Sequence, residues 1–266
     1  MSKLPLSLRI AANAGCSLVL AFLVLPILSV VPISLNKSSF IAMPPKAYSG
    51  VWYGRFFADP EWHSSLVHSL EIAAITTVLA LIIGTLAAIG LRRVNGRLRV
   101  GLTALFLAPM IVPVIVTAVA FYRSALDIGL NGTIIGMSLG HTILALPFVV
   151  INVGISLRTI DPNWISAAEG LGAGPFVIFR TVVLPHIVPG LTGAAVFSFV
   201  TSFDEVVIAV FMAGYGNKTL PVKIWESIRL EFTPVIAVAA TMMIAIAIVL
   251  FALSHSITPK ADEAPQ

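Results

Sequence analysis

Two adjacent carboxylates lie inside an otherwise apolar stretch of this sequence. Asp204 and Glu205 interrupt FSFVTSFDEVVIAVF, whose composition is that of a membrane-spanning segment. A carboxylate near the middle of a membrane costs about 2.5–3.5 kcal/mol on insertion scales, so such residues usually face a cavity or a partner. Helical neighbours are about 100° apart, so we expect one acid to face a cationic solute and the other to bond a neighbouring helix. The alternative is a purely structural ion pair, for instance with an arginine of a partner subunit.

No motif for nucleotide binding or hydrolysis accompanies the acid pair. The segment GYGNKT (214–219) lacks the glycine spacing of a phosphate loop, and no serine, histidine and aspartate order typical of a hydrolase is present. The single cysteine, Cys16, excludes a disulfide within the chain. We interpret His141 as a hydrogen-bonding residue between packed helices. We therefore expect no metal, no cofactor and no enzymatic activity in this chain; the five histidines, which do not share metal-ligand spacing, are His63, His68, His141, His186 and His255.

A second interruption, SAAEGLGAGPFVIFRTVVLP, covers residues 166–185. Asp161 and Pro162 before it are a favourable N-cap and first helical residue. Gly172 and Gly174 are expected to end this helix, Pro175 to start another and Pro185 to end that one. The pattern predicts two short helices joined by a glycine elbow, which either dock on a partner or pack on their own bundle. The apolar stripe of the first helix consists of Trp164, Ala167, Ala168 and Leu171.

The composition indicates which elements must position these residues. Hydrophobic residues make up 58% of the 266 residues and charged residues only 11%, and the mean hydropathy is +1.00. A soluble domain carries about 25% charged residues, so the chain is predicted to be a polytopic membrane protein. Its net charge of +4 comes from basic residues in loops, without the aromatic interleaving of a nucleic-acid groove.

Six apolar runs are long enough to cross a bilayer. The loop RRVNGRLR (92–99) contains four arginines, a strong signal for retention on the cytoplasmic side. We therefore expect both termini to be cytoplasmic. The predicted spans are Ile10–Ile33, Leu66–Leu91, Leu102–Tyr122, Thr133–Ile155, Ile187–Ala213 and Pro234–Ser254.

The second interruption resembles a known family. Its pattern A-A-x3-G-x9-[IV]-x-L-P is similar to the signature loop of permease subunits of binding-protein-dependent ABC importers. This resemblance implies an all-α polytopic membrane protein with six transmembrane helices, the type I ABC importer permease fold and cytoplasmic coupling helices. It implies a single permease domain over residues 1–266, with the coupling segment at 161–185. The residues implied in coupling to an ATPase are Ser166, Ala167, Ala168, Glu169, Leu171, Gly172 and Ala173.

The resemblance also implies partners. Permeases of this kind pair with a sister permease in a heterodimer, and act with two cytoplasmic ATP-binding subunits and a periplasmic substrate-binding protein in the bacterial inner membrane. ATP is bound by the partner subunits. This chain departs from the family pattern at Ser166, where a glutamate is usual, and at Glu169, where a basic residue is common.

Nearly the whole chain is similar to the second permease subunit of spermidine/putrescine transporters. The likeness rests on SFDEVVIAVFMAG, TLPVKIWESIR, WYGRFF and the paired prolines of LAPMIVP. It implies that Asp204, Glu205 and Trp52 take part in polyamine passage, which agrees with the affinity of amines for carboxylates and aromatic faces. Related permeases often carry an acid after a proline of span three, whereas this chain has Met110 and Val114.

Two alternatives follow. The same machine could carry another solute, such as an opine, an aminophosphonate or an amino acid derivative. A protein of another class, an ion-driven secondary transporter, would require internal inverted repeats, and the sequence contains no convincing repeat.

Overall fold

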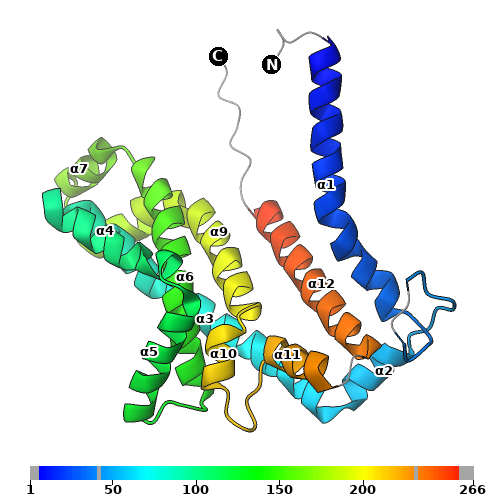
Figure 1. Cartoon of the computed structure of the whole chain (residues 1–266). Coiled ribbons are helices and arrows are strands. Elements are labelled where there is room, and N and C mark those ends of the chain that lie inside the picture. Colours follow the sequence, from blue (N-terminus) through cyan, green and yellow to red (C-terminus); the bar gives the residue numbers. More distant parts are fainter. Residues whose placement is uncertain (1–5, 41–42, 231–232, 258–266) are drawn as a thin grey trace. The chain divides into compact units, whose positions relative to one another are not determined.

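The computed structural model describes residues 6–40, 43–230 and 233–257, which are almost entirely helical (Figure 1). Within these ranges there is no β-strand, only an isolated bridge between Asn36 and Tyr48. The predicted all-α class is confirmed. The chain divides into two compact units, Met1–His63 with Glu226–Ala245 and Ser64–Trp225 with Ile246–Gln266, which are described separately.

The first unit contains α1 (Leu6–Ser34) and α2 (Val51–Ala58). The large apolar side chains of α1, such as Leu18 and Phe22, are exposed, as expected of a helix surrounded by lipid. The Ser34 hydroxyl at the end of α1 lies 2.9 Å from the Tyr53 hydroxyl of α2. This hydrogen bond links the two helices within the unit.

The second unit is built around α6 (Ile134–Arg158), which packs side by side with α9 (Leu184–Phe203) (Figure 1). Small residues permit this close approach. A Cβ on Gly190 of α9 would lie 2.7 Å from the carbonyl oxygen of Asn152 of α6. Gly140 of α6 permits a similar approach by α10 (Val207–Met212), since a Cβ there would lie 2.9 Å from Ile208 Cγ2.

Two apolar clusters stabilise this unit. One surrounds the buried side chains of Ile72, Met137 and Ile208, and the other surrounds Val149 and Ile187. Both draw on α6, so this helix forms the centre of the unit.

The helices long and apolar enough to span a membrane number five among the described residues, or six if one bent pair counts as a span. The five are α1, α3 (Pro60–Arg93), α6, the helical segment Pro175–Phe203, and α12 (Pro234–Ile257). A shorter helix, α11 (Leu220–Leu230), precedes the last of these spans.

The third span differs from its prediction. The apolar run Leu102–Tyr122 was expected to be one helix, but α4 (Gly96–Ile111) and α5 (Val114–Asp127) meet at an angle of 104°. Val112, which precedes Pro113, has extended backbone with φ −72° and ψ 132°. Proline disfavours the helical conformation in the residue before it, so Pro113 accounts for the bend.

Candidate functional site

The fifth span is interrupted at the acid pair. Helix α9 ends at Phe203, and α10 (Val207–Met212) begins only after Asp204, Glu205 and Val206. The prediction of one continuous span over Ile187–Ala213 is therefore wrong. The two acids lie in a break between helices, so the spacing of helical neighbours does not set their directions.

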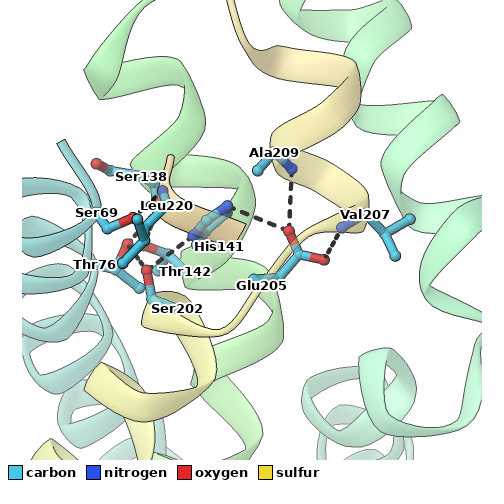
Figure 2. Close-up of polar contacts among 10 residues, drawn as sticks. All are labelled: Ser69, Thr76, Ser138, His141, Thr142, Ser202, Glu205, Val207, Ala209 and Leu220. Carbon is cyan, nitrogen blue, oxygen red and sulfur yellow. Dashed lines mark hydrogen bonds and ion pairs between the residues drawn. The ribbon is translucent and has the colours of Figure 1, made fainter. Parts of the chain in front are cut away.

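Glu205 caps the helix that follows the break (Figure 2). Its Oε1 accepts a hydrogen bond from the Val207 backbone N–H at 2.8 Å, and its Oε2 accepts one from Ala209 at 3.1 Å. The first N–H groups of a helix have no partner within the helix, and a carboxylate there is favoured by hydrogen bonding and by the helix dipole. The side chain is only 8% exposed. These bonds compensate for the break in α9 and hold Glu205 inside the protein.

His141 of α6 lies beside this carboxylate at the centre of a polar network (Figure 2). The imidazole is fully buried, with Nδ1 2.8 Å from Ser202 Oγ and Nε2 3.4 Å from Glu205 Oε2. The network continues through Thr76 of α3, and so joins α3, α6, α9 and the break. The interpretation of His141 as a hydrogen-bonding residue between packed helices is confirmed.

A chain of hydroxyl hydrogen bonds ends at His141. Thr76 Oγ1 donates to the Ser138 carbonyl oxygen, and Ser202 Oγ donates to Thr76 Oγ1. Ser202 Oγ can then accept a hydrogen bond from the imidazole Nδ1–H. The other ring nitrogen, Nε2, forms no hydrogen bond within the described residues and lies 3.4 Å from Glu205 Oε2.

Asp204 has the opposite environment. Its backbone N–H remains bonded to the Val200 carbonyl oxygen at 3.0 Å, but its side chain is exposed. No residue in the described ranges forms a hydrogen bond or ion pair with its carboxylate. Of the two acids, Asp204 is the one whose negative charge is open to a ligand.

Trp52, the third residue expected in the pathway, belongs to the first unit. It lies in α2 and is 4% exposed. The Arg55 guanidinium carbon lies 4.3 Å from the centroid of the Trp52 ring. This aromatic face therefore already holds a cation from its own helix.

The predicted coupling segment begins with α7 (Pro162–Gly170), as expected. Asp161 caps it by accepting a hydrogen bond from the Asn163 N–H at 2.9 Å. At the other end, Gly172 has a φ of +82°, its N–H bonds to Glu169 O at 2.9 Å, and Ala173 N–H bonds to Ala168 O at 3.0 Å. These two bonds and the left-handed glycine form a Schellman motif. The predicted glycine elbow is confirmed.

The second short helix differs from its prediction. It starts at Pro175 as expected, but α8 (Pro175–Ile178) continues through a π-helical turn, η1 (Phe179–Val183), into α9. Pro185 therefore does not end a helix; it lies in the first turn of α9. A proline has no N–H and crowds the preceding turn, and the wider π turn just before it, with Leu184 N–H bonded to Phe179 O, relieves that crowding.

The coupling segment presents an apolar surface. Leu171 is 89% exposed and Phe176 is 75% exposed, and Trp164 is also exposed. Ser166, Glu169 and Ala173 line a pocket of about 530 Å³ that also receives Arg92 and Arg93 of α3. Large apolar side chains gathered at an exposed elbow are typical of a docking surface.

The chain belongs to the family described as the binding-protein-dependent transport system inner membrane component, which matches residues 80–262. It is a multi-pass membrane permease subunit of an ABC importer, a class whose permeases are not themselves catalytic and work with a substrate-binding protein and nucleotide-binding subunits.

Individual relatives extend this result. The chain is 32% identical to the spermidine/putrescine transport system permease protein PotC of Haemophilus influenzae, over 93% of this chain and 96% of that protein. It is 32% identical to the putrescine transport system permease protein PotI of Escherichia coli K12, over 84% and 82% of the two chains. A solved bacterial ABC transporter that imports the acidic polysaccharide alginate has the same fold, with a TM-score of 0.75 at 17% identity over 96% of this chain and 99% of that chain.

Proposed function

We propose that this chain is the polyamine-conducting permease subunit of an ATP-driven importer. The relatives named for spermidine and putrescine transport support this cargo. The observation that carries the proposal is the exposed carboxylate of Asp204, which has no partner among the described residues and lies at a break in a membrane-spanning helix. A polyamine is a chain of protonated amines, and a carboxylate in a low-dielectric pathway attracts such a cation strongly.

The two acids have different roles in this proposal. Asp204 contacts the amine, whereas Glu205 holds the break in shape by capping α10 and contacting His141. Glu205 is buried and its carboxylate accepts two backbone hydrogen bonds, so Asp204 is the acid that remains open to the amine. Trp52 remains the aromatic residue proposed to contact the amine, although Arg55 lies over its ring in this structure.

The coupling segment 161–185 is the surface on which an ATPase subunit docks. Its exposed apolar side chains and its rigid Schellman elbow suit the transmission of movement, because a fixed turn passes displacement to the span that follows it. The complete transporter then contains a sister permease, two ATP-binding subunits and a periplasmic binding protein. This chain contributes one permease domain with both termini in the cytoplasm, and binds neither ATP nor any other cofactor.

Uptake by the reconstituted complex tests the proposal. Proteoliposomes containing the full complex, supplied with its binding protein and with ATP, are expected to accumulate radiolabelled putrescine or spermidine. Import of a different solute without either polyamine would overturn the cargo. Import that persists after the ATPase subunits are omitted would overturn the ABC mechanism and favour an ion-driven transporter.

A further inference from the structure

A second polar site lies away from the acid pair, in a pocket of about 450 Å³ between α3, α4 and α6. Each helix contributes one arginine near its end: Arg92 from the last turn of α3, Arg99 from the beginning of α4 and Arg158 from the last turn of α6. Three guanidinium groups from separate helices thus share one cavity.

Among the described residues, no acidic side chain neutralises the positive charge of this pocket. No acidic side chain lines it. Arg92 donates to the Ile160 carbonyl oxygen at 3.3 Å, which fixes its position but leaves its charge uncompensated. Arg99 and Arg158 form no ion pair with any residue in the described ranges. Converging guanidinium groups without a carboxylate are the arrangement that binds phosphate oxygens.

The rest of the pocket wall is apolar and open. Ile151 and Ile155 of α6 line it and are exposed, by 38% and 58%, and Leu107 of α4 lies opposite. Gly154 lies between the two isoleucines, and a Cβ there would meet no atom within 4 Å. The cavity therefore joins a cationic end to an open apolar groove, which suits a ligand with an anionic head and a hydrocarbon tail.

We propose that this pocket binds the headgroup of an anionic phospholipid, such as phosphatidylglycerol, with an acyl chain along the groove beside Gly154. Basic pockets between transmembrane helices bind such headgroups, which lie at the level of the helix ends. The proposal does not depend on the cargo. It shares Arg92 with the pocket of the coupling segment, but Arg99 and Arg158 do not line that pocket. The lipid would hold the ends of three helices together by supplying an anion that the described residues do not provide.

The neighbouring arginines provide a matched control. Arg93 and Arg97 belong to the same basic loop as Arg92 and Arg99 but do not line this pocket. The double variants R99Q/R158Q and R93Q/R97Q lose the same net charge. A general attraction between basic loops and anionic lipid would weaken equally in both, whereas a specific site is lost in the first variant alone.

Native mass spectrometry of the full transport complex, purified from membranes containing phosphatidylglycerol, tests the site. We expect the wild-type complex and R93Q/R97Q to retain the lipid and R99Q/R158Q to lose it by about tenfold or more. Equal retention in all three would overturn the proposal. So would a wild-type complex without bound lipid, the result expected if an acidic residue of a partner subunit covers the arginines.

A second pair of variants tests the groove without changing any charge. Gly154→Leu fills the open space beside the isoleucines, and Gly90→Leu adds the same side chain to an exposed site on α3 outside the pocket. Gly154→Leu should reduce lipid retention and Gly90→Leu should not. Release of the lipid by millimolar glycerol 3-phosphate together with full retention in Gly154→Leu would show a simple phosphate site and overturn the lipid assignment.

Discussion

The two acids of the fifth span are neighbours in sequence but differ in environment. The carboxylate of Glu205 accepts two backbone hydrogen bonds and lies beside the buried imidazole of His141, so its oxygens have partners within the protein. Asp204 has neither compensation and is exposed. A buried carboxylate is tolerated only when paired or hydrogen-bonded, so the break in the helix allows one acid to be structural while the other stays charged.

Exchanging each acid for its amide should separate these roles. Asp204→Asn removes the charge that attracts the amine, and a hydrogen bond to a charged group contributes about 1.5–3 kcal/mol. We therefore expect the KM for putrescine to rise about tenfold or more, with the melting temperature of the complex unchanged. Uptake kinetics and thermal unfolding of the same preparations measure both quantities.

The contrasting variant is Glu205→Gln. An amide keeps only one acceptor oxygen for the two N–H groups that Glu205 now caps, and the loss of a cap typically costs about 1 kcal/mol. We expect a lower melting temperature and a KM changed by less than about threefold. The reverse pattern, with a normal KM in Asp204→Asn and a raised KM in Glu205→Gln, would exchange the roles of the two residues.

Sequence alone locates the acid pair but not its partners. Polar residues within apolar runs stand out because each is costly in a membrane, and Asp204, Glu205 and His141 are identifiable on this basis. The network that joins them is not, because Thr76 and Ser202 are 126 residues apart and His141 and Ser202 are 61 apart. Only the packing of α3, α6 and α9 shows which hydroxyl each ring nitrogen faces.

At the scale of the elements, prolines show where sequence patterns succeed and fail. Pro113 bends the third span sharply, as the extended preference of the residue before a proline allows. Pro109, Pro147 and Pro189 nevertheless lie inside continuous helices. Pro185 was expected to end a helix but is accommodated by a π turn. Proline identifies candidate breaks, and the surrounding packing decides which of them form.

The end of α7 depends on the conformation of Gly172, and this supports a prediction for coupling. A proline cannot adopt a φ of +82°, so Gly172→Pro should disrupt the Schellman elbow between α7 and α8. We expect it to lower transport about tenfold or more, with the ATPase activity of the assembled complex no longer stimulated by the loaded binding protein. ATP hydrolysis and uptake are measured in the same proteoliposomes.

Gly174 provides the matched control for this elbow. Its φ is −70°, and a Cβ there meets no atom within 4 Å. Gly174→Ala should therefore couple ATP hydrolysis to transport normally.

A charge on α7 tests the docking of this helix. Ala168→Asp places a carboxylate at a half-buried position, and like Gly172→Pro it should uncouple ATP hydrolysis from transport if α7 docks on the ATPase. Normal coupling of ATP hydrolysis to transport in Gly172→Pro would show that the glycine elbow does not transmit movement from the ATPase to the spans.

At the scale of the whole molecule, the fold identifies the type of transporter but not the solute that it carries. The same fold occurs in a transporter that imports an acidic polysaccharide, whereas the relatives at 32% identity are named for cationic polyamines. Opposite charges can thus pass through one architecture. The fold therefore does not set selectivity. In the proposed function, Asp204 contributes to it, and the orientation of the chain sets the side from which the solute reaches this residue.

Cysteine accessibility tests that orientation. Cys16 is the only cysteine in the sequence, so replacing it with serine gives a background without thiols. Asn95→Cys lies in the basic loop, where the side chain makes no cap hydrogen bond, and Tyr215→Cys lies at a fully exposed position of the loop after α10. We expect a membrane-impermeant maleimide to label Tyr215→Cys in intact spheroplasts and Asn95→Cys only after permeabilisation. The basic loop and the coupling segment are predicted to lie on the cytoplasmic side. The opposite labelling would place both on the outer side, where no cytoplasmic ATPase subunit could dock on the coupling segment.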